Sequence, residues 1–291
     1  MKRILITGAN SYIGENVERH LCQWPEKYQV DTVDMIDGSW REKSFAGYDV
    51  IYHVAGIAHS DNGKISDEKA ALYYRVNTDL TVETAKKAKA EGVKQFIFMS
   101  SAIVYGDSAP IGKEKVITRD TPVSPANSYG DSKVQAEKGI LPLGDDKFKV
   151  VILRPPMIYG PGSKGNYPVL SKLAKKLPVF PAVDNKRSML YVGNLAEFVR
   201  LVIDNEECGI FWPQNSEYSN TTELVQMIAE VHGKKIVILH GFTWALKLLS
   251  HVTGLVNKAF GSLCYDMSLS EYQADYQRCF QRESIRRTEM M

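Results

Sequence analysis

The N-terminal stretch from Lys2 to Gly14 constrains the fold of this chain more than any other part of the sequence. Lys2–Thr7 is an apolar segment of the kind that forms a buried β-strand, and it leads into a turn with glycine at Gly8 and Gly14. A strand that turns through glycine into a helix presents the free amide groups and the dipole of that helix to an anion. We therefore predict a site for a dinucleotide pyrophosphate at this turn.

The first half of the chain alternates strand and helix patterns. Short β-branched or aromatic runs predict strands, and apolar residues at three- and four-residue spacing predict helices between them. The expected strands are Lys2–Thr7, Gln29–Asp34, Val50–His53, Gln95–Ser100 and Lys149–Leu153, and the expected helices are Tyr12–Gln23, Asp67–Ala90 and Ser128–Gly139. This alternation is typical of an α/β fold with a doubly wound parallel sheet, the Rossmann architecture.

The pattern changes after Gly162. Loops follow, with helices near Pro168–Leu177 and Asn194–Asp204 and a short strand at Ile210–Trp212. We expect residues 1–160 to form a Rossmann domain that binds NAD(P). Residues 161–291 are expected to form a smaller C-terminal substrate-binding lobe, partly interleaved with the sheet.

The glycine turn departs from the usual dinucleotide pattern at one position, since Ser11 replaces the middle glycine. Serine is small and can itself donate a hydrogen bond. Gly8 permits the tight turn, and Gly14 lets the helix pack close to the strand. The candidate cofactor-binding residues of this turn are Gly8, Asn10, Ser11, Tyr12, Ile13 and Gly14.

Asp34 ends the second expected strand, near the spacing at which an acidic residue meets the adenosine ribose hydroxyls. A carboxylate there favours NAD over NADP, because it would repel a 2′-phosphate. Asp31 and Asp37 flank this position as alternatives, and Arg41 leaves NADP open.

Tyr129 and Lys133 are four residues apart on an expected helix, and they therefore share a face. A free phenol titrates near ~10, and a neighbouring cation is expected to lower that pKa toward working pH. Tyr129 could then exchange a proton with a substrate oxygen while hydride moves at the attached carbon. Ser101 follows a strand and would hydrogen-bond the same oxygen, with Ser100 as the alternative. We predict Ser101, Tyr129 and Lys133 as the catalytic residues.

Together these residues resemble the extended short-chain dehydrogenase/reductases of the NAD-dependent epimerase/dehydratase family, which includes nucleotide-sugar 4-epimerases, dehydratases and 4-keto reductases. The resemblance runs from Lys2 to about Leu239. The motifs that carry it are Thr7–Gly14, His53–Gly56, Val76–Thr78, Ser100–Gly106, Tyr129 with Lys133, Arg154–Pro161 and Arg187–Val192.

The resemblance implies further roles. Ala55 and Gly56 would line the cofactor, Lys133 would also contact the nicotinamide ribose, and Pro155 and Pro156 would lie beside the nicotinamide. Asn77 would be structural. Arg187 would hold the diphosphate of the sugar nucleotide, with Ser101 and Tyr129 as the other substrate-binding residues. In the family, helices at the positions of Asp67–Ala90 and Ser128–Gly139 form a dimer contact, so we expect a homodimer.

The activity implied by the resemblance is epimerisation or ketone reduction at carbon 4 of a nucleotide-diphosphate sugar, with a place in polysaccharide biosynthesis. A protein that senses NAD(P) or acts as a scaffold, without turnover, is the alternative. The 4,6-dehydratases of the family have an Asp-Glu pair after the catalytic hydroxyl residue. Here Ala102 and Ile103 follow Ser101, and neither can move the protons of a water elimination.

Composition excludes other classes of protein. The formal net charge of +2 and the interspersed acidic residues argue against a nucleic-acid partner. The four cysteines are widely spaced, so we expect no metal site and a cytoplasmic location. No apolar run reaches the ~18 residues of a membrane span. Phe242–Leu263 predicts a pair of amphipathic helices packed on the domain, with attachment to a membrane surface as the alternative.

Overall fold

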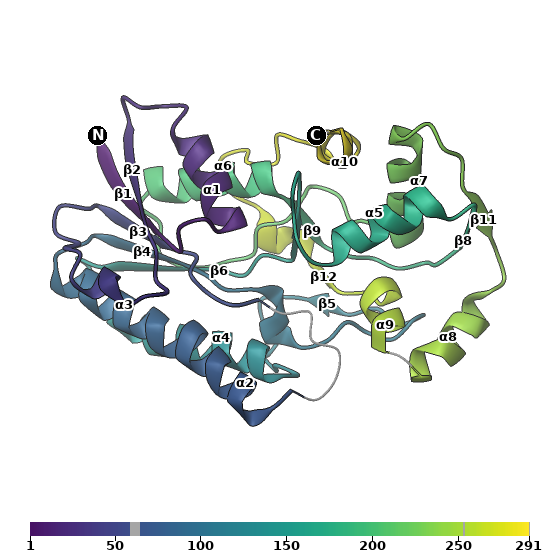
Figure 1. Ribbon diagram of the computed structural model, residues 1–291, viewed down its shortest axis with the longest axis horizontal. Coiled ribbons are helices and arrows are strands. Elements are labelled where there is room, and N and C mark those ends of the chain that lie inside the picture. The colour runs from purple at the N-terminus through teal and green to yellow at the C-terminus, as the bar shows by residue number, and fades with distance from the viewer. Residues whose placement is uncertain (59–64, 253, 291) are drawn as a thin grey trace.

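A six-stranded parallel sheet forms the centre of the protein in a computed structural model, which describes residues 1–58, 65–252 and 254–290 (Figure 1). The strand order is β10-β6-β4-β3-β1-β2, and every neighbouring pair is parallel. The strands are β1 (Lys2–Thr7), β2 (Tyr28–Val33), β3 (Val50–His53), β4 (Gln95–Met99), β6 (Lys149–Leu153) and β10 (Gly209–Phe211). The chain reverses direction across the sheet between β1 and β3, which confirms the predicted doubly wound topology and marks the edge where such folds bind ligands.

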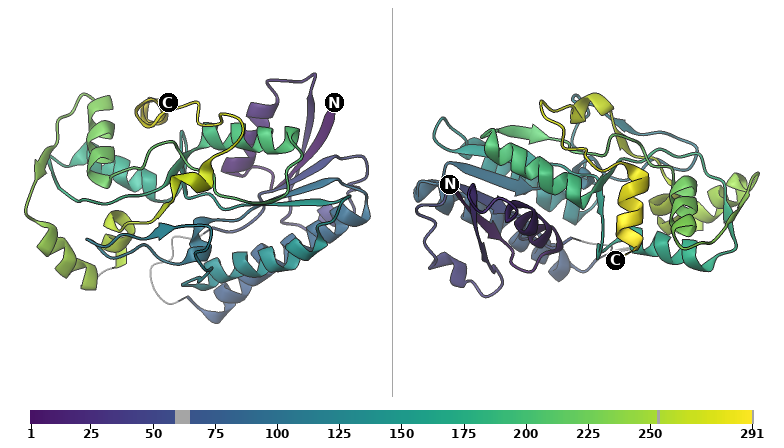
Figure 2. Two further views of the ribbon diagram at one scale, coloured as in Figure 1. Left: turned by 180° about the vertical axis from the view of Figure 1, so that it is seen from behind. Right: turned by 90° about the horizontal axis from the view of Figure 1, so that it is seen from above.

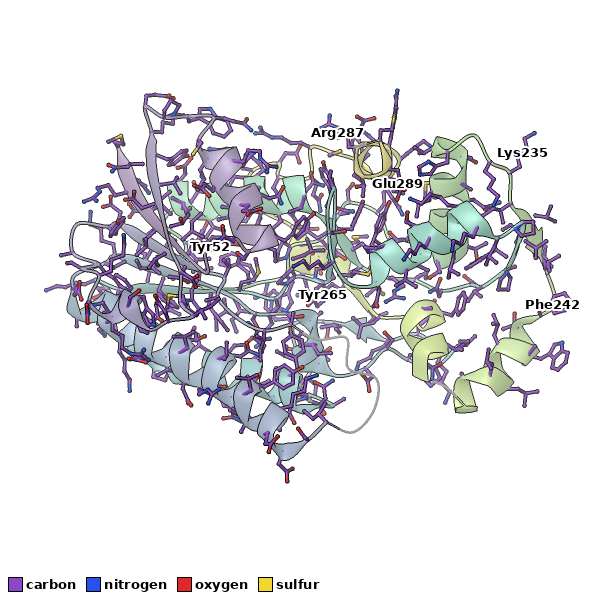
Figure 3. The ribbon with its side chains drawn as sticks, in the orientation of Figure 1. Tyr52, Lys235, Phe242, Tyr265, Arg287 and Glu289 are labelled. Atoms are coloured by element: carbon purple, nitrogen blue, oxygen red, sulfur yellow. The ribbon has the colours of Figure 1, made fainter. Side chains whose placement is uncertain are left out.

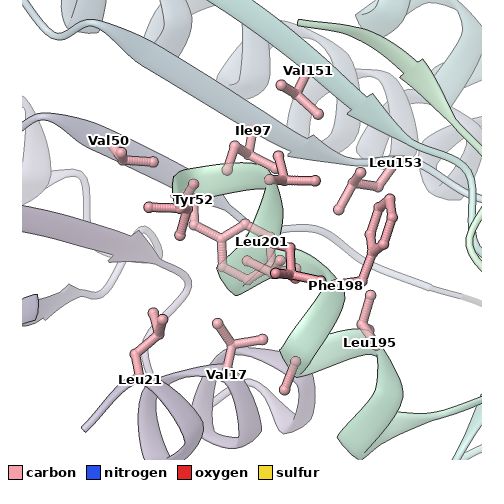
Figure 4. Packing of buried hydrophobic residues seen from close by; sticks show 14 of the residues in the cluster. Val17, Leu21, Val50, Tyr52, Ile97, Val151, Leu153, Leu195, Phe198 and Leu201 are labelled. Atoms are coloured by element: carbon pink, nitrogen blue, oxygen red, sulfur yellow. The ribbon is translucent and has the colours of Figure 1, made fainter. Parts of the chain in front are cut away.

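Helices cover both faces of this sheet. The pair α1 (Tyr12–Leu21) and α6 (Val192–Asp204) lies side by side on one face (Figure 2). The other face is covered by α4 (Ser128–Ile140) and by α2 (Asp67–Tyr73) and α3 (Leu80–Ala90), which are joined through the π-helical turn Tyr74–Asp79. Apolar side chains of α1 and α6, among them Val17 and Phe198, pack on Ile97 and Leu153 of the sheet (Figure 4). Burial of this apolar area holds the helices on the sheet.

The second lobe lies beyond the carboxyl ends of the strands. A core of aromatic and aliphatic side chains holds it together, with Tyr167, Phe180 and Ile228 fully buried or nearly so. Its helices are α5 (Asn166–Lys176), α7 (Thr221–Val231), α8 (Thr243–Val252), α9 (Gly254–Phe260) and α10 (Gln281–Glu289). Its short strand pairs are β8 (Val179–Pro181) with β11 (Val237–Leu239), β7 (Met157–Tyr159) with β9 (Met189–Tyr191), and β5 (Val116–Ile117) with β12 (Cys264–Tyr265).

Several predicted boundaries differ from the structure. The first helix ends at Leu21 rather than Gln23, and the strands expected to reach Asp34 and Ser100 end at Val33 and Met99. The strand expected at Ile210–Trp212 is β10, which pairs with β6 and is the edge strand of the central sheet. Within the described residues, none of the helices has the length and apolar content needed to cross a bilayer.

Candidate active site

The glycine turn after β1 has the backbone geometry that the sequence predicts. Gly8 adopts φ of +83°, and a Cβ there would lie 2.9 Å from backbone atoms of Ala55. Asn10 also adopts a positive φ, of 64°. Ser11 is the N-cap of α1, and its Oγ accepts a hydrogen bond from the backbone N–H of Gly14 at 3.1 Å. The substitution of serine for glycine therefore stabilises the helix start and leaves the hydroxyl proton available to donate.

Tyr12 and Ile13 direct their side chains away from this turn. Tyr12 packs against the core of the second lobe, and its hydroxyl is so close to Gly160 that a Cβ there would lie 2.7 Å away. That hydroxyl has no hydrogen-bond partner among the described residues, and burial raises its pKa. Ile13 packs against the core between the sheet and α1. What these two residues offer at the turn is their backbone N–H groups, which belong to the unpaired first turn of the helix.

Asp34 lies directly after β2, with its side chain exposed. Its Oδ1 accepts a hydrogen bond from the backbone N–H of Ile36 at 2.9 Å. The flanking alternatives have other contacts, because Asp31 accepts from the Tyr48 hydroxyl at 2.7 Å and Asp37 accepts from Ser39 at 2.7 and 3.0 Å. Asp34 and Asp37 are both exposed after β2, and Asp34 is the one that directly follows the strand.

Arg41 is the residue that keeps NADP as a possible cofactor in the sequence, and in the structure its guanidinium contacts other side chains. Its guanidinium makes a bidentate ion pair with Glu83 of α3, at 2.5 and 2.6 Å, and lies 4.7 Å from the centre of the Trp40 ring. An arginine that neutralises a carboxylate is less available to a 2′-phosphate.

Tyr129 and Ser101 meet at the carboxyl edge of the sheet. Tyr129 lies in the first turn of α4, whose N-cap Asn127 accepts a hydrogen bond from the N–H of Gly130 at 2.8 Å. Burial raises the pKa of Tyr129 to about 12, and a hydrogen bond with the Ser101 side chain opposes that rise. The expected lowering of this pKa by Lys133 is therefore wrong for the chain by itself, because desolvation outweighs every opposing contact.

Lys133 lies one helical turn beyond Tyr129 and is buried. Its ammonium donates to the backbone carbonyl of Met99 at 3.0 Å and lies 4.7 Å from the centre of the Phe98 ring. A Cβ on Gly56 would lie 3.3 Å from Lys133 Nζ. Burial lowers the pKa of Lys133 to about 8. The Lys133 ammonium therefore lies close to the Gly56 backbone and is hydrogen-bonded to the carboxyl end of β4.

The structure gives Ser100 and Ser101, the two candidates for the catalytic serine, different contacts. Ser100 is buried, and its Oγ donates to Glu137 at 2.5 Å. Ser101 begins the 3-10 turn Ala102–Tyr105, where its Oγ accepts from the N–H of Ile103 at 3.3 Å. Only Ser101 is brought to Tyr129.

Asn77 and the two prolines complete the surroundings of this edge. Asn77 accepts from the N–H of Ile57 at 2.9 Å and donates to its carbonyl at 3.1 Å, so it anchors the loop after Gly56. The carbonyl of Pro155 accepts from the N–H of Ala102 at 2.9 Å, and Pro156 is buried beside it.

Arg187 lies in the second lobe, between β8 and β9. Its backbone pairs with that of Ser219 in both directions, and its Nη1 donates to the carbonyl of Ala259 in α9 at 2.9 Å. Burial lowers the pKa of Arg187 to about 10. The guanidinium is therefore fixed to α9 and desolvated.

A buried polar network behind the site was missed at the level of sequence. Glu137 accepts from Arg154 Nε at 3.1 Å and from Nη2 at 2.6 Å. Arg154 Nη1 and the indole Nε1 of Trp212 each approach the Tyr105 hydroxyl at 2.7 Å. The available signal was the position of Glu137, four residues after Lys133 on the same helix face.

No group of three or more potential metal ligands occurs in the part of the chain that the structure describes. The arrangement instead defines a class of protein: a Rossmann-type α/β protein with a dinucleotide turn beside a serine, a tyrosine and a lysine. The model of the NAD-dependent epimerase/dehydratase family matches residues 4–211. The chain belongs to this family.

Individual relatives agree with that assignment. The chain is 31% identical to a UDP-glucose 4-epimerase of Vibrio cholerae, over 92% of this chain and 88% of the relative. It is 27% identical to the N-acetyl-α-D-glucosaminyl-diphospho-ditrans,octacis-undecaprenol 4-epimerase of Escherichia coli O157:H7, over 91% of this chain and 79% of the relative.

Two solved structures share the fold. One is MoeE5 in complex with UDP-glucose and NAD, with a TM-score of 0.72 at 20% identity, covering 99% of this chain and 97% of that one. The other is the dTDP-4-dehydrorhamnose reductase of Bacillus anthracis in complex with NADP. Its TM-score is 0.73 at 20% identity, and the match covers 100% of this chain and 99% of the reductase.

Proposed function

We propose that this protein is an NAD(P)-dependent enzyme that acts at carbon 4 of a nucleotide-diphosphate sugar, as a 4-epimerase or a 4-keto reductase. The observation that carries the proposal is the meeting of Ser101 and Tyr129 at the carboxyl edge of the sheet, with the Lys133 ammonium under Gly56. When bound, NAD(P) supplies or accepts the hydride. An NAD(P) sensor without turnover remains the alternative, but a sensor has no need of a proton-exchanging set.

In this proposal each side chain has a separate task. Tyr129 exchanges a proton with the substrate oxygen, and Ser101 donates a hydrogen bond to that oxygen as charge develops on it. Lys133 and the backbone of Ala55 and Gly56 face the nicotinamide ribose, with Pro156 on the neighbouring strand end. The turn from Gly8 to Gly14 holds the pyrophosphate, and Arg187 holds the diphosphate of the substrate.

The product distinguishes the proposed reactions. Ser101 is followed by Ala102 and Ile103 at the start of a 3-10 turn, and neither side chain can carry protons. We expect no water-loss product from UDP-glucose, UDP-N-acetylglucosamine or dTDP-glucose. Mass spectrometry of the product should show an unchanged mass for epimerisation, or a gain of two hydrogens when a 4-keto sugar nucleotide is supplied. Loss of one water would contradict the proposal, and an absence of any turnover across these substrates would favour the sensor.

Asp34 predicts the choice of cofactor. We expect the protein to bind NADH more tightly than NADPH, because the exposed carboxylate repels a 2′-phosphate and Arg41 is paired with Glu83. Titration followed by cofactor fluorescence measures both affinities. Asp34→Asn should narrow the difference, whereas Asp37→Asn, at an exposed carboxylate that caps Ser39, serves as the matched control. Equal affinities in the unmodified protein would contradict the assignment of Asp34.

A sugar diphosphate carried by a polyprenol is a second candidate substrate. The relative from Escherichia coli is named for such a substrate, and the exposed apolar helix α8 lies in the lobe that contains Arg187. Offering the lipid-linked and the nucleotide-linked sugar in the same assay distinguishes the two.

Three broader expectations belong to the same proposal. Residues 1–160 serve as the NAD(P)-binding domain and residues 161–291 as the substrate-binding lobe. The division is interleaved, since α6 and β10 join the layers of the central sheet and β5 and β7 pair with strands of the second lobe. The protein works in the cytoplasm, in polysaccharide biosynthesis. It is a homodimer whose contact is formed by α2–α3 and α4, and a monomeric mass in light scattering at micromolar concentration would contradict this.

A further inference from the structure

Helix α8 exposes a concentration of large apolar side chains. Phe242, which precedes the helix, is 48% exposed, and Trp244, Leu248 and Leu249 are 64%, 64% and 48% exposed. Trp244 and Leu248 are one helical turn apart, so they share a face. Of the other exposed large apolar residues in the described chain, Val179 and Val237 are cross-strand partners in β8 and β11, the pair that precedes α8, and the rest are spread along the sequence. A gathered apolar surface of this kind marks an interaction site rather than ordinary surface variation.

This helix lies at the end of the molecule opposite the N-terminus (Figure 1). It packs against α9 and follows the strand β11, and its Lys247 side chain lies against the loop at Gly112. The Phe242 ring points away from the protein, and Lys235 lies at the same end of the molecule (Figure 3). A planar partner could therefore meet the helix without first displacing another part of the fold.

The charged residues in the segment around α8 are all positive. Residues 231–265 contain Lys234, Lys235, Lys247 and Lys258 and neither aspartate nor glutamate. The whole chain has 36 basic and 34 acidic residues, so this segment alone accounts for more than the excess of positive charge. Glu114 is an acidic residue outside this segment, on a nearby loop, and its carboxylate is paired with Lys186 at 3.3 Å.

We propose that α8 docks the protein onto an anionic lipid bilayer, with Trp244 and Leu248 in the interface and the exposed Lys235 toward the headgroups. Tryptophan and leucine on one face of a helix, beside lysines and without acidic residues, are typical of helices that lie in the plane of a membrane surface. A second copy of this chain would bring the same positive charge against itself. A nucleic acid would leave the apolar side chains exposed to water. An anionic bilayer buries the apolar side chains and also attracts the positive charge.

Docking would also place the substrate lobe at the membrane. Arg187 is bonded to α9 through Ala259, and α9 packs against α8. If Arg187 holds a diphosphate, which rests on the proposed function, that group would be bound next to the headgroup layer. A sugar diphosphate on a lipid could then reach the site without leaving the bilayer.

Cosedimentation of the full chain with vesicles tests the docking. We expect binding to vesicles of phosphatidylglycerol mixed with phosphatidylcholine, and about tenfold weaker partitioning for Trp244→Ser combined with Leu248→Ser. Raising the salt from about 0.1 M to about 1 M should weaken the binding, because the screening length falls from about 10 Å to about 3 Å. Phe280→Ser is the matched control, since Phe280 is 61% exposed on another part of the surface, and it should bind like the unmodified protein.

Three results would overturn the proposal. The first is that the unmodified protein does not sediment with anionic vesicles. The second is that the double variant sediments with them as much as the unmodified protein does. The third is that binding to vesicles of pure phosphatidylcholine is as strong as binding to anionic vesicles and does not depend on salt. Loss of self-association in the double variant without a change in vesicle binding would assign the helix to a second copy instead. Turnover of a soluble nucleotide sugar should be the same in the double variant and in the unmodified protein, so failure of the docking and failure of the proposed activity are distinguishable.

Discussion

Replacing Tyr129 with phenylalanine is expected to lower turnover by roughly 10² or more while cofactor binding stays nearly unchanged. The substitution removes the hydroxyl that exchanges the proton and keeps the ring, whose centre lies 5.7 Å from that of Tyr73. Steady-state kinetics on the substrate identified by product analysis, together with a cofactor titration, measure the two effects separately.

Tyr74→Phe is the matched control. Tyr74 is a neighbouring, partly buried tyrosine whose hydroxyl donates to Asp131 at 2.8 Å and not to Ser101. Tyr74→Phe also removes a phenolic hydroxyl that makes a hydrogen bond, but this hydroxyl has no place in the proposed proton exchange, so turnover by this variant should stay close to that of the unmodified protein. Near-full turnover by Tyr129→Phe would exclude the proposed mechanism, and an equal loss in both variants would point to a general weakening of this part of the fold.

Local sequence patterns were sufficient for the elements around the cofactor turn. The apolar run of β1 and the spacing of Gly8 and Gly14 are properties of neighbouring residues, so the strand, the turn and the start of α1 could be predicted. Periodicity predicts that α1 ends at Gln23, two residues beyond its observed end at Leu21. Helix ends depend on how the last turn is capped and packed, and periodicity does not report this.

Features that depend on distant parts of the chain could not be predicted in the same way. The place of β10 at the edge of the central sheet depends on pairing with β6 across more than fifty residues of sequence, which a short apolar run does not specify. The choice between Ser100 and Ser101 depends on Glu137, which takes the Ser100 hydroxyl. The pKa of Tyr129 depends on how deeply the phenol is buried, and helical spacing from Lys133 carries no information on burial.

Glu137→Gln is expected to cost about 3–5 kcal/mol of the free energy of unfolding. The carboxylate lies 3.1 and 2.6 Å from two nitrogens of Arg154, and the two side chains are only 4% and 8% exposed. Glutamine is close to glutamate in size, so packing changes little. The guanidinium would be left buried without a counter-charge, with the Tyr105 hydroxyl as a remaining contact. Urea unfolding measures the loss.

Glu83→Gln makes the same chemical change at the surface and serves as the control. Glu83 also holds an arginine by two oxygens, but it and Arg41 are 45% and 52% exposed. Solvent screens such a pair, so its removal should cost far less stability than Glu137→Gln. The double variant Glu137→Leu with Arg154→Met should recover much of the stability lost by Glu137→Gln, because it removes both charges and refills the space with apolar atoms. If the double variant were as unstable as the single one, the loss would come from disrupted packing and not from an unpaired buried charge.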